Sequence, residues 1–110
     1  MPAYVDSLYQ EQIEFYDTSG TAINVSSYAF GMEWYRQGES SPSVTLTEGD
    51  GITVTSAASG IIVIALTPAQ TVTLGRGMAR VLLFQNYAND STRKLIAEGS
   101  EAIEGETYDA

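Results

Sequence analysis

The sequence has no cysteine and no histidine, and Lys94 is the single lysine among five basic residues. Without cysteine, disulfides and thiolate metal sites are excluded, and without histidine the usual zinc ligand is missing as well. No serine or threonine has a histidine to activate it, so the common forms of acyl-transfer chemistry are excluded. These absences favour a non-catalytic protein that uses no cofactor and no metal.

Positive charge is also scarce, because five basic residues face fourteen acidic ones and the formal net charge is −9. A chain of this charge is repelled by phosphate backbones and by anionic lipid surfaces. Its longest apolar run has six residues, whereas a membrane-spanning helix needs about 20. We therefore expect neither nucleic acid nor a membrane among its partners.

The totals favour one folded domain. The chain has 110 residues, near the commonest size of a single domain, and 44% of them are hydrophobic. We predict a β-sheet domain over residues 8–105, preceded by a flexible N-terminal arm over residues 1–7 and followed by an acidic C-terminal tail over residues 106–110.

The strongest pattern is the run from Ile61 to Leu66, in which four of six apolar residues are β-branched. Such residues favour a strand over a helix. Period 2 divides the run into two faces, one of Ile62, Ile64 and Leu66 and the other of Ile61, Val63 and Ala65. Because both faces are apolar, we expect cover on both sides, from two layers of this chain or from a second subunit.

Lighter, one-sided patterns surround this run. They predict strands over residues 8–16, 28–36, 44–47, 52–55, 78–87 and 92–104. Residues 48–51 predict a tight hairpin, and Gly99 predicts a bend in the last strand. Thr67, Pro68 and Gln70 predict the capped start of a short helix between sheets. The whole pattern is typical of an all-β, antiparallel sandwich of about seven strands with one short crossover helix.

Three features have a chemical interpretation beside a structural one. The aromatic face that contains Trp34 suits a sandwich core, or a sugar-binding platform if Trp34 is exposed. Residues 48–51 suit a hairpin, or a calcium loop, although the EF-hand spacing is missing. Glu14 and Glu33 suit ordinary strand faces, or the two carboxylates of a glycosidase. We favour the structural interpretation of each.

Five short segments follow one another in a distinctive order over residues 8–105: a strand ending in arginine, a G-I-x-V strand, an apolar strand after a glycine, a short helical turn and a hairpin segment that begins R-x-L and ends in glycine. They are Met32–Arg36, Gly51–Val54, Gly60–Thr67, Thr71–Gly77 and Arg93–Gly99. This order resembles a domain of bacteriophage and prophage tail, baseplate and fibre proteins. One departure is Arg80-Val81-Leu82, where that family often has tyrosine, aspartate and leucine, so no interaction of that aspartate is expected.

The resemblance implies an immunoglobulin-like β-sandwich that serves in the assembly of a phage or prophage particle without catalytic activity, and we expect it at the tail, baseplate or neck. It implies other phage structural proteins as partners, self-association into a homo-oligomer, and a location in the virion after synthesis in the bacterial cytoplasm. The main alternative is a carbohydrate-binding β-sandwich module. An enzyme is a third alternative, and would require two acids that face each other in a cleft.

We expect protein contacts at the N-terminal arm, at exposed tyrosines and at the acidic C-terminal segment. Tyrosine is enriched at protein interfaces, and arms become ordered on assembly. The candidate interface residues are Tyr4, Val5, Tyr28, Tyr35, Tyr87, Glu101, Glu104 and Glu106. For the acidic segment, the alternative is a solvated sheet edge whose charges discourage strand addition.

Overall fold

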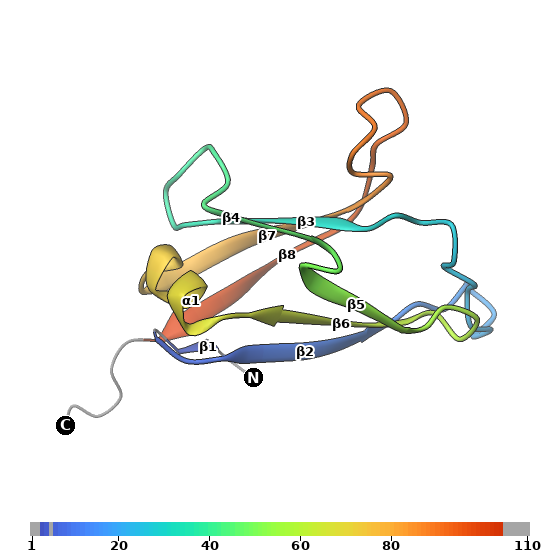
Figure 1. Ribbon diagram of the computed structural model, residues 1–110, viewed down its shortest axis with the longest axis horizontal. Coiled ribbons are helices and arrows are strands. Elements are labelled where there is room, and N and C mark those ends of the chain that lie inside the picture. Colours follow the sequence, from blue (N-terminus) through green and yellow to red (C-terminus); the bar gives the residue numbers. More distant parts are fainter. Residues whose placement is uncertain (1–2, 5, 105–110) are drawn as a thin grey trace.

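The computed structural model describes residues 3–4 and 6–104 (Figure 1). Its elements are β1 (Ala3–Tyr4), β2 (Tyr9–Glu14), β3 (Gly31–Tyr35), β4 (Val44–Glu48), β5 (Gly51–Ser56), β6 (Ile61–Leu66), α1 (Pro68–Leu74), β7 (Gly77–Gln85) and β8 (Lys94–Glu104). The eight strands form one hydrogen-bonded sheet in the order β1-β8-β7-β3-β4-β5-β6-β2. The predicted all-β sandwich is confirmed.

The sheet folds over on itself into two layers, with β8, β7, β3 and β4 in one and β5, β6 and β2 in the other (Figure 1). The side chains between the layers form the core, and several of them are at most 2% exposed: Trp34, Leu46, Ile52, Ile62, Ile64 and Leu66. Burying each of these side chains stabilises the fold by about 1.5–3 kcal/mol. Trp34 is a core residue, as its position on an alternating apolar face predicted.

β6 is covered by the chain on one face only. Ile62, Ile64 and Leu66 are buried between the layers, whereas Ile61, Val63 and Ala65 are half-buried on the outside. The reason is that β6 is the middle strand of one of the two layers, between β5 and β2, so only its inner face meets the other layer. Among the described residues, no second layer covers the outer face of β6. This outer face is available to a partner.

The prediction of an antiparallel hairpin at residues 48–51 is wrong. β4 and β5 pair in parallel, with Thr47 opposite Gly51 and Glu48 opposite Ile52. The Asp50 N–H donates to the Thr47 carbonyl over 2.9 Å, which closes a tight turn, and Gly51 has φ 101°. This left-handed backbone suits glycine and turns the chain away from an antiparallel return, so that β5 starts the second layer.

α1 confirms the predicted crossover helix. The Gln70 N–H donates to Thr67 Oγ1 over 3.2 Å, and the Thr67 N–H donates to Gln70 Oε1 over 2.9 Å, which completes a capping box. Leu74 is buried, so the helix packs on the core while it carries the chain from β6 to β7 in the other layer. With seven residues, it is too short to cross a membrane.

The bend predicted at Gly99 is also misplaced. Gly99 keeps a regular pair with Val81, and the register shifts instead where Leu83 faces Ala97 and Phe84 faces Leu95. Ile96 is therefore the extra residue of a bulge, which bends β8 nearer to its start.

β1 lies within the segment predicted as a flexible arm. Ala3 pairs with Ile103 and Tyr4 with Glu104, in parallel with β8, and Ala3 is buried. The Ser7 N–H donates to Thr71 Oγ1 of α1 over 3.2 Å. β1 and Ser7 are thus bound to β8 and to α1, at the same end of the sandwich.

Candidate functional site

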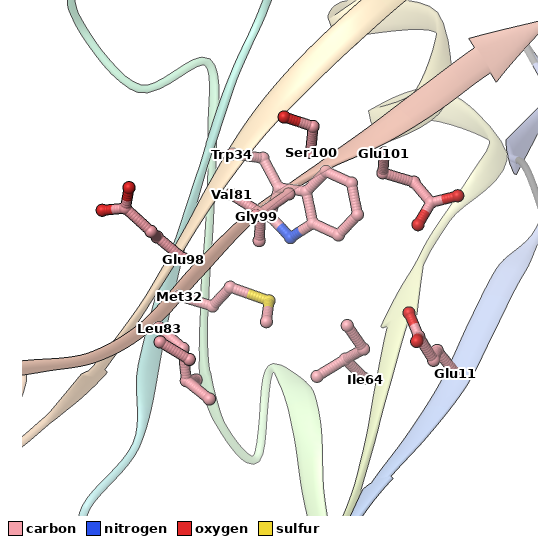
Figure 2. Close-up of a pocket in the computed structure, with 11 residues that line it drawn as sticks. Glu11, Met32, Trp34, Ile64, Val81, Leu83, Glu98, Gly99, Ser100 and Glu101 are labelled. Carbon is pink, nitrogen blue, oxygen red and sulfur yellow. The ribbon is translucent and has the colours of Figure 1, made fainter.

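A pocket opens between β2 and β8, on the side where the two layers separate (Figure 2). It has a volume of about 190 Å³. Its inner wall is apolar and consists of Met32, Trp34, Ile64, Val81 and Leu83. Three acidic side chains, Glu11, Glu98 and Glu101, line its rim.

The pocket exists because β8 presents small residues to the core. Ala97 pairs with Leu83, and Gly99 pairs with Val81, so both point inward. A Cβ atom at Gly99 would meet no other atom within 4 Å. Where a larger inward residue would fill the space between the layers, the glycine leaves it open.

Trp34 brings an unpartnered hydrogen-bond donor to this pocket. The side chain is 1% exposed, and its indole Nε1 has no hydrogen-bond partner. Figure 2 shows that this nitrogen lies on the side of the ring facing Met32 and the open middle of the pocket. A buried donor without an acceptor costs about 1–3 kcal/mol, so native proteins rarely contain one without a reason.

Two carboxylates meet at the mouth of the pocket. The Tyr9 hydroxyl donates to Glu11 and, over 3.2 Å, to Oε1 of Glu101. Figure 2 shows the two carboxylates pointing toward each other, whereas Glu98 points away from the pocket. Glu11 lies on the inward face of β2, opposite the buried Ile64. The site therefore has a negative mouth and an apolar interior.

The surroundings of Tyr9 keep it protonated. Burial raises the pKa of its hydroxyl, and the hydrogen bonds to Glu11 and Glu101 and the charges of these carboxylates raise it further. The hydroxyl thus remains a donor at neutral pH. It holds together two like charges that would otherwise repel each other across the seam between β2 and β8.

The prediction that Tyr28, Tyr35 and Tyr87 are exposed is wrong. Tyr35 is 8% exposed, and Tyr28 and Tyr87 are half-buried. Tyr28 packs against the ring of Phe30, with the ring centres 5.4 Å apart. For the other two tyrosines the cause is Glu33, a buried carboxylate on the outer face of β3, which accepts hydrogen bonds from the hydroxyls of Tyr35 and Tyr87. A buried carboxylate must be hydrogen-bonded, and these two tyrosines satisfy it.

Two arginines cover the rings of these tyrosines. The guanidinium carbon of Arg80 lies 4.3 Å from the ring centre of Tyr35, and that of Arg93 lies 4.4 Å from the ring centre of Tyr87. These cation–π contacts cover β3 on its outer face. The outer surface of β3 is therefore a packed polar cluster.

The other predicted interface residues are divided between two places. Tyr4 is 41% exposed and pairs with the exposed Glu104 at the α1 end of the sheet. Glu101 turns inward to the pocket, away from the surface strip to which the sequence assigned it. Val5 and Glu106 lie outside the described residues, as does the tail over residues 106–110.

The alternative chemistries can be compared with this geometry. Trp34 is buried, so it offers no platform to a sugar. Glu14 and Glu33 are no catalytic pair, because each carboxylate has its own separate partners. Glu33 is buried and bonded to Tyr35 and Tyr87, whereas Glu14 is exposed and bonded to Gln12 and Tyr16. Among residues 3–4 and 6–104, no group of three or more acidic side chains is arranged to hold a metal ion.

Two acids do face each other across a cleft, namely Glu11 and Glu101, a pair that the sequence did not reveal. The wall behind them is apolar, with the Trp34 N–H as an unpartnered donor. A sugar ring needs several polar partners, whereas an apolar chain with a positive end fits these groups. The arrangement suits binding better than glycoside hydrolysis.

No known family matches this chain, and no curated protein matches it. The resemblance to phage tail domains therefore depends on the order of its short segments alone.

Proposed function

We propose that this protein is a non-catalytic structural module that works through protein–protein contacts, with copies of itself and with other structural proteins of a phage or prophage particle. The resemblance of its segments suggests the particle and its tail, baseplate or neck. The contact surface is suggested by the distribution of exposed apolar side chains.

Four large apolar side chains are exposed at the α1 end of the sandwich. They are Tyr4 (41% exposed), Leu8 (62%), Val72 (51%) and Met78 (52%), and together they are called the end patch below. This concentration of apolar groups on one end is the observation that carries the proposal. Exposed apolar surface that gathers in one region marks a protein interaction site more often than scattered single residues do.

The strand register and one side-chain contact place these residues together. Met78 pairs with Ala102 and Tyr4 pairs with Glu104, so both side chains lie on the outer face beside the C-terminal end of β8. Leu8 and Val72 follow Ser7 and Thr71, which are hydrogen-bonded to each other. Figure 1 shows β1, α1 and the start of β7 at the same end of the molecule.

Light scattering on the purified full chain tests the proposal. Over a rising protein concentration, we expect a mass that is a multiple of the 11.8 kDa monomer. The double variant Val72→Asp/Met78→Asp is expected to be monomeric, because charges in an apolar interface remain unpaired. The control Tyr16→Asp/Leu95→Asp changes two equally exposed apolar residues elsewhere and should still associate.

A wild-type mass of 11.8 kDa at every concentration would contradict self-association. Equal masses of the two double variants would contradict the choice of the end patch. The particle itself is tested by mass spectrometry of phage particles purified after prophage induction in the organism that encodes the chain. We expect peptides of this protein in the particles, and their absence would contradict a virion role.

A further inference from the structure

We propose that the pocket between β2 and β8 binds an amine with three parts: a single positive end group, a short apolar chain and a carbonyl acceptor at the far end. The positive group lies between Glu11 and Glu101, the chain lies on the apolar wall, and the carbonyl accepts the Trp34 indole N–H. This inference uses no residue of the end patch, so it does not depend on the proposed function.

The carboxylates supply the charge selection. Glu11 and Glu101 share the hydroxyl of Tyr9, which has one proton to donate. Within the part of the chain that the structure describes, the recorded salt bridge joins Arg93 to Asp90, away from these acids. An ammonium or guanidinium group between the two carboxylates would make charge-assisted hydrogen bonds to both.

The apolar wall supplies the middle of the site. Met32, Ile64 and Leu83 are each at most 3% exposed and border a volume of about 190 Å³. Gly99 leaves the space free on the β8 side. An inorganic cation would leave this apolar space unfilled, whereas a methylene chain would bury its surface there.

The indole supplies the far end. Its Nε1 is buried, has no partner and faces the pocket, so an entering acceptor would satisfy a donor that the fold leaves unpaired. The unpartnered indole N–H distinguishes this site from an ordinary pair of surface acids. It also sets the orientation of the ligand, because the donor lies inside and the carboxylates lie at the rim.

N-acetylputrescine has all three parts and is the probe of choice. Two matched compounds each lack one part: n-butylammonium has no carbonyl, and N-butylacetamide has no charge. Because Trp34 is the only tryptophan, an ¹⁵N-labelled full chain gives a single indole N–H resonance in an NMR titration. We expect N-acetylputrescine to shift this resonance saturably, with n-butylammonium and N-butylacetamide each binding about tenfold more weakly.

Variants locate the binding. Glu11→Gln and Glu101→Gln should each weaken the binding of N-acetylputrescine about tenfold. Glu98→Gln removes the same charge from the same rim but from a side chain that points away, so binding should not change. Gly99→Val should abolish binding while the rest of the NMR spectrum retains the dispersion of a folded sheet.

The source of the amine is a further outcome of the same titration. Lysine blocked at both backbone ends, Nα-acetyl-lysine N-methylamide, retains its side-chain ammonium group. Tighter binding of this compound would assign the ligand to a basic side chain of a partner protein. Tighter binding of N-acetylputrescine would assign it to a free metabolite-sized amine. An indole resonance that none of these compounds moves, or that moves equally in the Glu11→Gln, Glu101→Gln and Glu98→Gln variants, would overturn the proposal.

Discussion

The hydroxyl of Tyr87 donates a hydrogen bond of 2.7 Å to Oε2 of Glu33, which is 54 residues earlier in the chain. The ring of Tyr87 lies over Gly31, and the hydroxyl of Tyr35 occupies the other carboxylate oxygen of Glu33. Two positions of β3, Gly31 and Glu33, thus interact with a loop residue that follows β7. The contact helps to explain why the outer face of β3 is buried as well as the inner face, where Met32 and Trp34 belong to the core.

Removal of the Tyr87 hydroxyl should destabilise the protein. Tyr87→Phe retains the ring over Gly31 but leaves one oxygen of the buried Glu33 without its donor. Because Tyr87 is half-buried and solvent can replace part of the bond, we expect the free energy of unfolding in urea to fall by about 1 kcal/mol. Tyr16→Phe is the control, since it removes a similar bond to Glu14 at an exposed site and should have no measurable effect. Equal losses in the two variants would contradict the role of Glu33.

Gly31 should tolerate no side chain while Tyr87 is present. A Cβ atom at this position would clash with Cβ and Cγ of Tyr87. We expect Gly31→Ala to lower the free energy of unfolding by about 2 kcal/mol, because the ring must move away from Glu33. In the Tyr87→Ala background, the same substitution should cost much less, which a double-mutant cycle measures. Additive losses would show that the clash lies elsewhere.

Gly99→Val should stabilise the fold. The added side chain enters the open pocket, and valine favours a strand where glycine disfavours it. We expect the free energy of unfolding to rise by about 1 kcal/mol, measured by urea denaturation with Gly99→Ala as an intermediate case. If the pocket is a binding site, this gain in stability accompanies the loss of binding. A less stable Gly99→Val protein would mean that the space beside Gly99 is too narrow for a valine side chain.

Alkaline pH should destabilise the protein. The pKa values of Tyr9, Tyr35 and Tyr87 are raised, in Tyr9 and Tyr87 first by burial and in Tyr35 first by its hydrogen bond to Glu33. In the unfolded chain, tyrosines lose their protons near pH 10, while the folded chain retains them. The stabilisation is therefore complete below about pH 10 and decreases above it. We expect Tyr9→Phe to have a shallower loss between about pH 10 and 12, measured by urea denaturation at each pH. An unchanged slope would contradict the raised pKa of Tyr9.

Local patterns predicted the parts of the fold that local forces determine. The β-branched run of β6, the capping box at Thr67 and the burial of Trp34 each depend on neighbours in the sequence or on simple alternation. The β4–β5 connection was mispredicted because a glycine turn suits both an antiparallel hairpin and a passage between layers. Which one forms depends on packing that the turn residues do not encode.

The pocket was missed because its residues meet only in the folded sheet. Glu11 and Glu101 are far apart in sequence, and the Tyr9 hydroxyl joins them across two strands that are not neighbours in the sheet. One signal was present: Glu11 interrupts the apolar face of β2 between Tyr9 and Ile13. A second was the series of small inward residues, Ala97 and Gly99, in β8. Neither signal indicates a pocket until the register of β8 on β7 is known.

The parallel pairing of β4 with β5 has a mechanical consequence. It joins the two layers by backbone hydrogen bonds along one side. On the other side, β1 and β2 are the edge strands of the sheet, and each is paired with one neighbour only. The sandwich therefore has a hinge at β4–β5 and a seam at β2–β8, where the Tyr9 hydroxyl is a cross-link. Thermal fluctuations open such a molecule from the seam, so amide hydrogens of β2 exchange with solvent before those of β3. A ligand in the seam would act as a latch and slow that exchange.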